Sequence, residues 1–205
     1  ALSMGPPQAK AVLLETAAMG AESGVLVSDR RLGGADVLAT GYTLSQAVRT
    51  LGKVDLILCG KQTTDGDTAQ VGAEMAEFLG LPHANNVQSV EPDGEGYVKV
   101  RIDLDSHISV QRLPLPCVLC IASEVNTPRL PSYRRKKSLP PDCVKTISLD
   151  DFGDREPAHY GLTGSPTQVE RIFPPEKNSE KEMLHGSGED MAKELAAILR
   201  CRKLI

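Results

Sequence analysis

The residues best suited to chemistry lie in a polar segment, 60–72, which reads Gly-Lys-Gln-Thr-Thr-Asp-Gly-Asp-Thr-Ala-Gln-Val-Gly. The apolar run 55–59 before it predicts a buried strand of a parallel sheet. After it, apolar residues from Val71 to Leu79 fall on one face of a helix. A polar, glycine-containing loop between a strand and a helix offers free backbone N–H groups and a positive dipole end to a phosphate. We therefore predict a nucleotide site at the carboxyl edge of an α/β sheet.

The spacing in this segment leaves a second interpretation open. The segment contains neither the P-loop pattern nor the Gly-x-Gly-x-x-Gly pattern of dinucleotide-binding folds. It could be an ordinary polar loop in which Asp67 or Thr68 caps the following helix. Spacing alone does not decide between a phosphate site and a capped helix.

Composition excludes several classes of function. A net charge of −4 over 205 residues argues against nucleic-acid binding. An aromatic content of 3 %, without tryptophan, argues against base stacking. No apolar run reaches the roughly 20 residues of a membrane span, so no membrane insertion is expected. The odd number of cysteines, several in apolar runs, predicts reduced core thiols and a cytoplasmic location.

Two cysteines form a C-x-x-C motif, Cys117 and Cys120. They lie in an apolar run, 116–122, that is typical of a strand, and residues three apart on a strand face opposite sides. We therefore expect small core hydrophobes and no metal site. The histidines are scattered, and no Ser/His/Asp or Cys/His arrangement indicates a catalytic residue.

Strands that alternate with helices over the first eighty residues predict a three-layer α/β fold, a parallel sheet with helices on both faces. Thr43 or a nearby residue is expected to cap the helix that carries Leu44 to Leu51. Further on, apolar segments 87–90 and 97–102 flank Pro-Asp-Gly-Glu-Gly and predict an antiparallel hairpin that extends the sheet.

We divide the chain into an α/β domain, 1–148, and a C-terminal arm, 149–205, that ends in an amphipathic helix from Gly188. Such an arm is typical of subunit docking, although it could also fold back on its own domain. The segment 123–138 is rich in proline and basic residues. It is either a solvated charge run or a protruding loop that binds a partner. Its candidate contacts are Arg129, Leu130, Tyr133, Arg134 and Arg135.

With these residues in view, the segment 60–72 resembles the nucleotide-binding signature of the electron transfer flavoprotein β subunit. The resemblance covers essentially the whole chain in order, and further matching segments are 2–7, 18–21, 126–129 and 161–167. The segments 29–36, 39–44 and 65–72 are most similar to the electron-bifurcating branch of that family. Members of this branch hold FAD in the β subunit, whereas ordinary members hold a structural AMP there.

The resemblance implies an adenine-nucleotide α-hydrolase-like fold and a heterodimer with an α subunit that carries a second FAD. In the bifurcating branch, NADH reduces the β-site flavin. One electron then goes to ferredoxin or flavodoxin, and the other goes through the α-subunit FAD to an acyl-CoA dehydrogenase or a quinone reductase. The chain would thus be an electron-carrier subunit of an oxidoreductase complex with no stand-alone activity. The alternative is an ordinary β subunit that takes electrons from acyl-CoA dehydrogenases.

Carried over by position, the resemblance implies that residues 60–71 wrap the adenosine and the phosphates. Thr40 and Thr43 would contact the second phosphate or the ribitol, and Met4 and Gly5 would lie near the adenine. The 60–71 set consists of Gly60, Lys61, Gln62, Thr63, Thr64, Asp65, Gly66, Asp67, Thr68, Ala69, Gln70 and Val71.

Two further expectations follow from the family pattern. The segment 126–137 matches the recognition loop, with Tyr133 where relatives often carry leucine. Relatives begin with about sixty residues of βαβ structure before the segment at Leu2. The chain is therefore expected to be a fragment that lacks a central strand, and an intact mass near 22 kDa for the purified protein would contradict this.

An ATP-using α/β enzyme, in which Asp65 and Asp67 hold Mg²⁺, is the third possibility for the function of the chain.

Overall fold

The computed structural model describes residues 1–64, 66–104, 106–174, 181 and 183–205. It divides the chain into two compact units, Ala1–Gln168 and Val169–Ile205. We predicted a boundary at 148/149, whereas the first unit in the structure also includes residues 149–168. The reason is the packing of Leu149, Phe152 and Tyr160, which are buried in one hydrophobic cluster with Val27 and Ala47.

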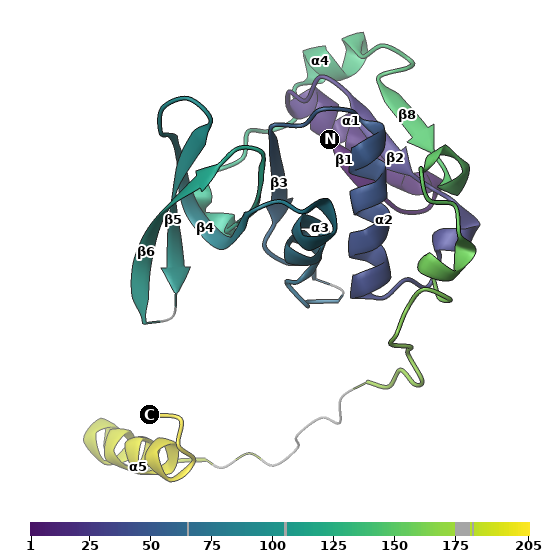
Figure 1. Cartoon of the computed structure of the whole chain (residues 1–205). Coiled ribbons are helices and arrows are strands. Elements are labelled where there is room, and N and C mark those ends of the chain that lie inside the picture. Colours follow the sequence, from purple (N-terminus) through teal and green to yellow (C-terminus); the bar gives the residue numbers. More distant parts are fainter. Residues whose placement is uncertain (65, 105, 175–180, 182) are drawn as a thin grey trace. The chain divides into compact units, whose positions relative to one another are not determined.

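The strands of the first unit form two sheets (Figure 1). The parallel three-stranded sheet has the order β1 (Leu2–Met4), β2 (Gly24–Val27), β8 (Val144–Ile147). The five-stranded sheet has the order β3 (Leu56–Gly60), β7 (Cys117–Ile121), β4 (His83–Pro92), β5 (Tyr97–Leu104), β6 (His107–Pro114). In the second sheet β3, β7 and β4 run parallel, and β5 and β6 extend it as antiparallel strands.

Helices connect these strands, and α2 and α3 lie side by side (Figure 1). The α-helices are α1 (Lys10–Met19), α2 (Val37–Thr50), α3 (Val71–Leu79), α4 (Tyr133–Ser138) and, in the second unit, α5 (Gly188–Cys201). Short 3₁₀ turns occur at Pro7–Ala9, Arg30–Leu32, Ser123–Val125, Leu149–Asp151 and Pro157–His159.

The predicted α/β class with parallel strands and an antiparallel hairpin is confirmed. The sheet differs from the prediction in one respect, because β1 and β3 are each at the edge of a separate sheet. The prediction that 55–59 is buried is wrong: Leu58 on β3 is 61 % exposed, since β3 pairs only with β7. Helix α2 joins the two sheets, with Ala47 in the cluster of β2 and Val48 in the cluster of β7.

Helix α2 starts earlier than we predicted. Its N-cap is Asp36, whose carboxylate accepts a hydrogen bond from the Ala39 N–H at 3.0 Å, and Thr43 lies in the helix interior. The sequence Thr-Gly-Tyr-Thr around Gly41 looks like a helix boundary because glycine disfavours helix interiors. However, a Cβ on Gly41 would lie 3.0 Å from the Cβ of Glu74, so the close approach of α3 requires glycine there.

Cys117 and Cys120 lie on β7 and face opposite sides of the sheet, as predicted. Cys117 is buried in the cluster that contains Val87 and Leu119, while the Cys120 sulfur faces Gly72 of α3. All five cysteines are free thiols. Within the described ranges, no helix combines the length and the apolar character needed to cross a bilayer.

Candidate nucleotide-binding site

The predicted phosphate loop leaves β3 at its carboxyl end, and its described residues are exposed up to Gln70. Asp67 and Ala69 have φ of 53° and 55° in the left-handed region, which is unfavourable for residues other than glycine. Backbone strain of this kind costs on the order of 1–3 kcal/mol and concentrates at ligand sites. The Gln62 amide donates to the Asp67 carboxylate at 2.5 Å and bridges the loop. Asp65, another predicted site residue, lies outside the described residues.

The N-terminus of α3 is open. Gln70 is its N-cap, with φ −109° and ψ −26°, and no side-chain cap hydrogen bond forms there. The alternative interpretation, in which Asp67 or Thr68 caps this helix, is therefore wrong. A left-handed Ala69 followed by a right-handed Gln70 is a backbone arrangement that turns successive N–H groups toward one point and suits an anion. The loop and the helix start thus have the geometry of a phosphate site.

The N-terminus of α2 is already occupied by a carboxylate. Asp36 accepts hydrogen bonds from the backbone N–H and the hydroxyl of Thr167, at 3.0 and 2.7 Å, in addition to the one from Ala39. Burial raises the pKa of Asp36, but these hydrogen bonds outweigh it and lower the pKa overall. A fixed negative charge at this helix end disfavours a phosphate there.

Of the two threonines predicted to contact the ligand from α2, Thr43 is not available. Its side chain is fully buried, and its hydroxyl donates to the Ala39 carbonyl at 2.6 Å inside the helix. The prediction for Thr43 is therefore corrected. Thr40, one turn earlier, is half-buried next to Gly41, the contact point of α2 with α3.

Glu74 is a residue of this region that the sequence did not single out. Its Oε2 atom is buried and has no hydrogen-bond partner among the residues that the structure describes. Burial, and then the charge of Asp36, raises its pKa. Glu74 lies in the first turn of α3. In the sequence it looks like any acidic residue near a helix start, and its position next to Gly41 of α2 appears only in the folded chain.

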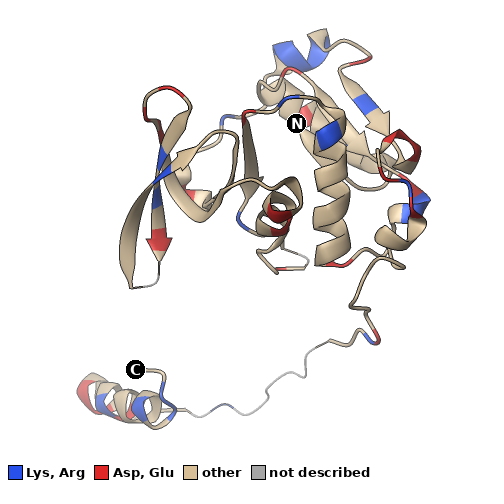
Figure 2. Cartoon of the chain, in the orientation of Figure 1, with Lys and Arg blue, Asp and Glu red and all other residues tan. Residues whose placement is uncertain are grey.

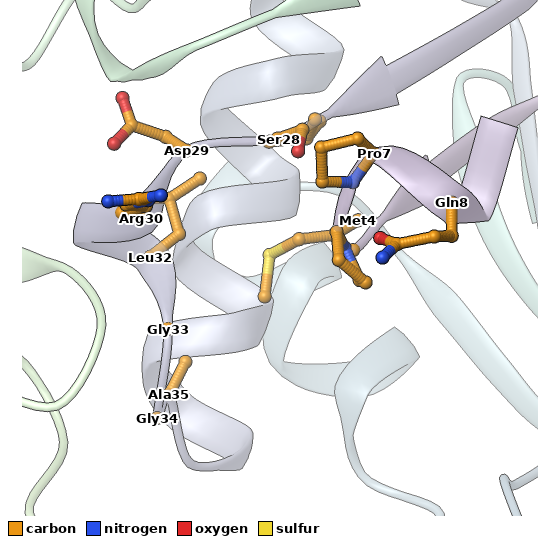
Figure 3. A pocket seen from close by; sticks show the side chains of 13 residues that line it. Met4, Pro7, Gln8, Ser28, Asp29, Arg30, Leu32, Gly33, Gly34 and Ala35 are labelled. Carbon is orange, nitrogen blue, oxygen red and sulfur yellow. The ribbon is translucent and has the colours of Figure 1, made fainter.

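Met4 and Gly5 line a separate cavity of about 700 Å³ at the carboxyl ends of β1 and β2 (Figure 3). This edge of a parallel sheet is where ligands commonly bind. The 29–35 loop forms the other wall, with Asp29, Arg30 and Gly33 among its residues. The loop residues 60–71 are not part of this lining, so the structure places the predicted site residues in two neighbourhoods.

An ion-pair network fixes the wall of this cavity. Arg31 contacts Asp29 at 2.6 Å and Asp150 at 2.9 Å. The hydrogen bonds from Arg31 lower the pKa of Asp29 to about 2. Asp29 also accepts from the Arg31 N–H as the N-cap of the 3₁₀ turn. This acidic and basic pair holds the loop in place, and no motif of the sequence indicates it.

The predicted partner-binding segment contains exposed apolar side chains next to anchored basic ones. Leu130 is 87 % exposed and Tyr133 is 72 % exposed. Arg135 turns back toward the end of α1. Its Nη1 atom lies 3.1 Å from the position that a Cβ atom would occupy if Gly20 had one. Figure 2 shows the basic residues gathered on α4, and the Lys137 ammonium lies 5.0 Å from the centre of the Tyr133 ring.

Comparison with known proteins places this chain in a family. The model of the electron transfer flavoprotein domain matches residues 1–142. The chain belongs to the electron transfer flavoprotein family. It is 40 % identical over 189 residues to the electron transfer flavoprotein subunit beta of Megasphaera elsdenii, which covers 87 % of this chain and 67 % of that relative.

Two other relatives of this electron transfer flavoprotein family member carry names that mention CoA reductases. The caffeyl-CoA reductase-Etf complex subunit CarD of Acetobacterium woodii is 38 % identical over 186 residues, 91 % of this chain and 70 % of the relative. The acryloyl-CoA reductase electron transfer subunit gamma of Anaerotignum propionicum is 35 % identical over 211 residues, 100 % of this chain and 79 % of the relative. The chain is thus a homologue of the family's β subunits, as its sequence motifs predicted.

Proposed function

We propose that this chain is the β subunit of a heterodimeric electron transfer flavoprotein of the bifurcating type and binds FAD along residues 60–71. The complex takes electrons from NADH and delivers them to ferredoxin or flavodoxin and to an acyl-CoA dehydrogenase or a quinone reductase. The observation that carries the proposal is the uncapped start of α3 directly after the left-handed Asp67 and Ala69.

The residues present fit the phosphates and the ribose of a dinucleotide. The backbone N–H groups from Thr68 to Val71 suit the phosphates, because they lie at the positive end of α3. Asp67 and Gln70 offer polar groups to ribose oxygens on the exposed side of the loop. When bound, FAD supplies the exchange between a two-electron donor and one-electron acceptors, and the protein holds and orients it.

Two surfaces support the proposed protein partners. The segment with Leu130 and Tyr133 presents apolar side chains beside positive charges, a combination that suits an acidic redox partner. Helix α5 has apolar residues on one side, Met191, Leu195 and Ile198, and none of its residues is buried. We assign α5 to docking of the α subunit, because a 14-residue amphipathic helix needs a surface that covers its apolar side.

The names of the relatives favour the bifurcating type with a CoA-ester reductase as partner, because two of them mention such reductases. A cytoplasmic location belongs to the same proposal and rests on the cysteine usage of the sequence.

An anaerobic assay of the purified heterodimer tests the function. With NADH present, we expect reduction of ferredoxin or flavodoxin only when an acyl-CoA dehydrogenase and its enoyl-CoA substrate are also added. Reduction of the heterodimer by acyl-CoA dehydrogenase together with no oxidation of NADH would contradict the proposal. That result would support the ordinary β subunit with structural AMP.

The ATP-using enzyme remains a weaker candidate. It needs Asp65 and Asp67 as ligands of Mg²⁺, and the segment 60–72 lacks the P-loop pattern. Magnesium-dependent ATP hydrolysis by the purified chain would support this candidate.

A further inference from the structure

Two thiols that are distant in the sequence meet on adjacent strands of the five-stranded sheet. Cys59 on β3 and Cys120 on β7 are direct partners in the parallel register. Partner residues on neighbouring strands point to the same face of a sheet and lie about 4.8 Å apart. This separation falls within the Cα distances of about 4.4–6.8 Å that disulfides span. The Cα spacing of this strand pair is therefore compatible with a disulfide.

Gly72 of α3 confirms that both side chains point to one place. A Cβ on Gly72 would overlap the Cys120 sulfur and would lie 3.6 Å from the Cys59 sulfur. Both sulfurs therefore face the first turn of α3. Helix N-termini and nearby hydrogen-bond donors favour the thiolate form of cysteine.

The two cysteines differ in access. Cys120 is buried, whereas Cys59 is half-buried on β3, at the edge of the sheet. The other core thiols differ from this pair: Cys117 faces the opposite side of the sheet, and Cys143 lies in the cluster of Leu13 and Leu26. Among the described residues, only the Cys59 and Cys120 pair combines partner positions on adjacent strands with one half-buried member.

We propose that Cys59 and Cys120 form a redox-active dithiol that a low-molecular-weight disulfide, such as oxidised glutathione, converts into an intramolecular disulfide. The inference does not rest on the proposed function. It assigns a modification site to the strand pair beneath the first turn of α3.

Oxidation of the pair takes place in two thiol–disulfide exchange steps. The Cys59 thiolate attacks one sulfur of the small disulfide, a mixed disulfide forms, and the first small thiolate leaves with the proton that Cys59 gave up. The Cys120 thiolate then attacks the Cys59 sulfur, and the second small thiolate leaves with the proton of Cys120. The two cysteines lose two electrons and two protons, and the small disulfide is reduced to two thiols.

Hydrogen bonding between the neighbouring thiols shifts the pKa values of the two cysteines in opposite directions. It lowers the pKa of Cys120, because the Cys59 thiol donates to the thiolate that forms there, and it raises the pKa of Cys59. The Cys120 sulfur therefore carries the negative charge more readily than the Cys59 sulfur, which suits its role as the attacking thiolate once the mixed disulfide has formed on Cys59. Cys117 lacks such a donor, and burial raises its pKa.

Thiol trapping tests the proposal on the full chain with the exposed Cys201 replaced by serine, which prevents links between chains. The reduced protein is equilibrated with defined ratios of reduced and oxidised glutathione, alkylated and digested for mass spectrometry. We expect a cross-linked peptide pair that contains Cys59 and Cys120, loss of two hydrogens from the intact mass, and alkylated Cys117 and Cys143. A stable glutathione adduct on Cys59 without the cross-link would overturn the proposal, as would no reaction at all.

Phenylarsine oxide, which bridges neighbouring thiol pairs, gives an independent measurement on the reduced protein. We expect one equivalent to bind, and we expect prior oxidation or Cys59→Ser to abolish that binding. Cys117→Ser is the matched control, since it removes a thiol from the same strand but from the other face, and it should bind one equivalent. Equal binding by the Cys59→Ser variant would contradict the assignment. Because Cys59 is on an edge strand, we expect the Cys59→Ser variant to fold. If this variant does not fold, the cross-link between Cys59 and Cys120 in the wild-type protein tests the proposal.

Discussion

The sulfur of Cys120 occupies the space that a Cβ on Gly72 would need, so α3 approaches β7 as closely as a glycine allows. We predict that Gly72→Ala destabilises the first unit by about 1–3 kcal/mol, because the extra methyl group overpacks the interface. Urea unfolding of the variant and the wild type measures the difference through the transition midpoint.

A double-mutant cycle isolates this contact. Cys120→Ala removes the sulfur, so Gly72→Ala should cost much less in a Cys120→Ala background. Gly153→Ala is the matched control, since no atom lies within 4 Å of its added Cβ. Additive effects of the two substitutions would show that another contact of residue 72 is responsible.

Glu74 makes stability depend on pH through its raised pKa. The folded state holds the proton of this carboxyl more tightly than the unfolded state does. The contribution is therefore fully present below the ordinary glutamate pKa of about 4.3 and is lost as the pH rises through the raised value. We predict that Glu74→Gln, which cannot ionise, stabilises the protein at pH 7 by at most about 1 kcal/mol. Unfolding at pH 4 should show no such gain, and a gain of equal size at both pH values would contradict this account.

Asp154 connects the 149–168 segment to α2 through hydrogen bonds, and it makes stability depend on pH in the direction opposite to Glu74. Its carboxylate accepts from the Tyr42 hydroxyl at 2.6 Å and contacts His159 at 2.6 Å. The hydrogen bond from Tyr42, with those from Glu156 and His159, lowers its pKa to about 2. Stability from this group is present above the ordinary aspartate pKa and is lost as the pH falls toward 2.

We therefore predict that Asp154→Asn costs about 1–3 kcal/mol at pH 7 and that the cost shrinks as the pH falls below about 4. Urea unfolding at several pH values measures this. Tyr160→Phe is the control, because the Tyr160 hydroxyl donates to the Asp154 backbone carbonyl, which does not titrate. A cost of Asp154→Asn that stays constant down to pH 3 would rule out the charged hydrogen bonds as its source.

Local sequence patterns predicted most elements, because strand and helix periods are local properties. The hairpin of β4 and β5, the strand at 117–121 and helix α5 all lie where these periods put them. The early start of α2 could not be predicted, because Gly41 is tolerated in the helix only through its contact with Glu74. Likewise, the meeting of Cys59 with Cys120 depends on which strands pair, and local spacing carries no signal of that.

The sequence likewise predicts only part of the candidate nucleotide-binding site. The loop before α3 was found through its composition and its place after a strand. The sequence does not reveal that Thr43 is unavailable, because its burial and the cap of α2 at Asp36 depend on distant contacts. The unpartnered Glu74 oxygen was missed for the same reason.

Tyr133 offers a test of the proposed partner surface. Its ring is largely exposed, so Tyr133→Ala should leave the melting temperature unchanged. We predict that the KM for the partner dehydrogenase rises about tenfold and that kcat changes little, because a central interface anchor is worth about 1–2 kcal/mol. Tyr133→Leu should retain most of the affinity, and Lys136→Ala is a control for charge alone. An unchanged KM for Tyr133→Ala would remove this residue from the interface.

The cofactor content of the purified heterodimer tests the central claim most directly, with two substitutions at Ala69. Its left-handed backbone suits glycine and excludes a β-branched residue, so Ala69→Gly should keep the phosphate site and Ala69→Val should disrupt it. Extraction and quantification of nucleotides should give two FAD per heterodimer for the wild type and Ala69→Gly, and one FAD for Ala69→Val. One FAD with one AMP in the wild type, or two FAD in all three proteins, would contradict FAD binding along residues 60–71.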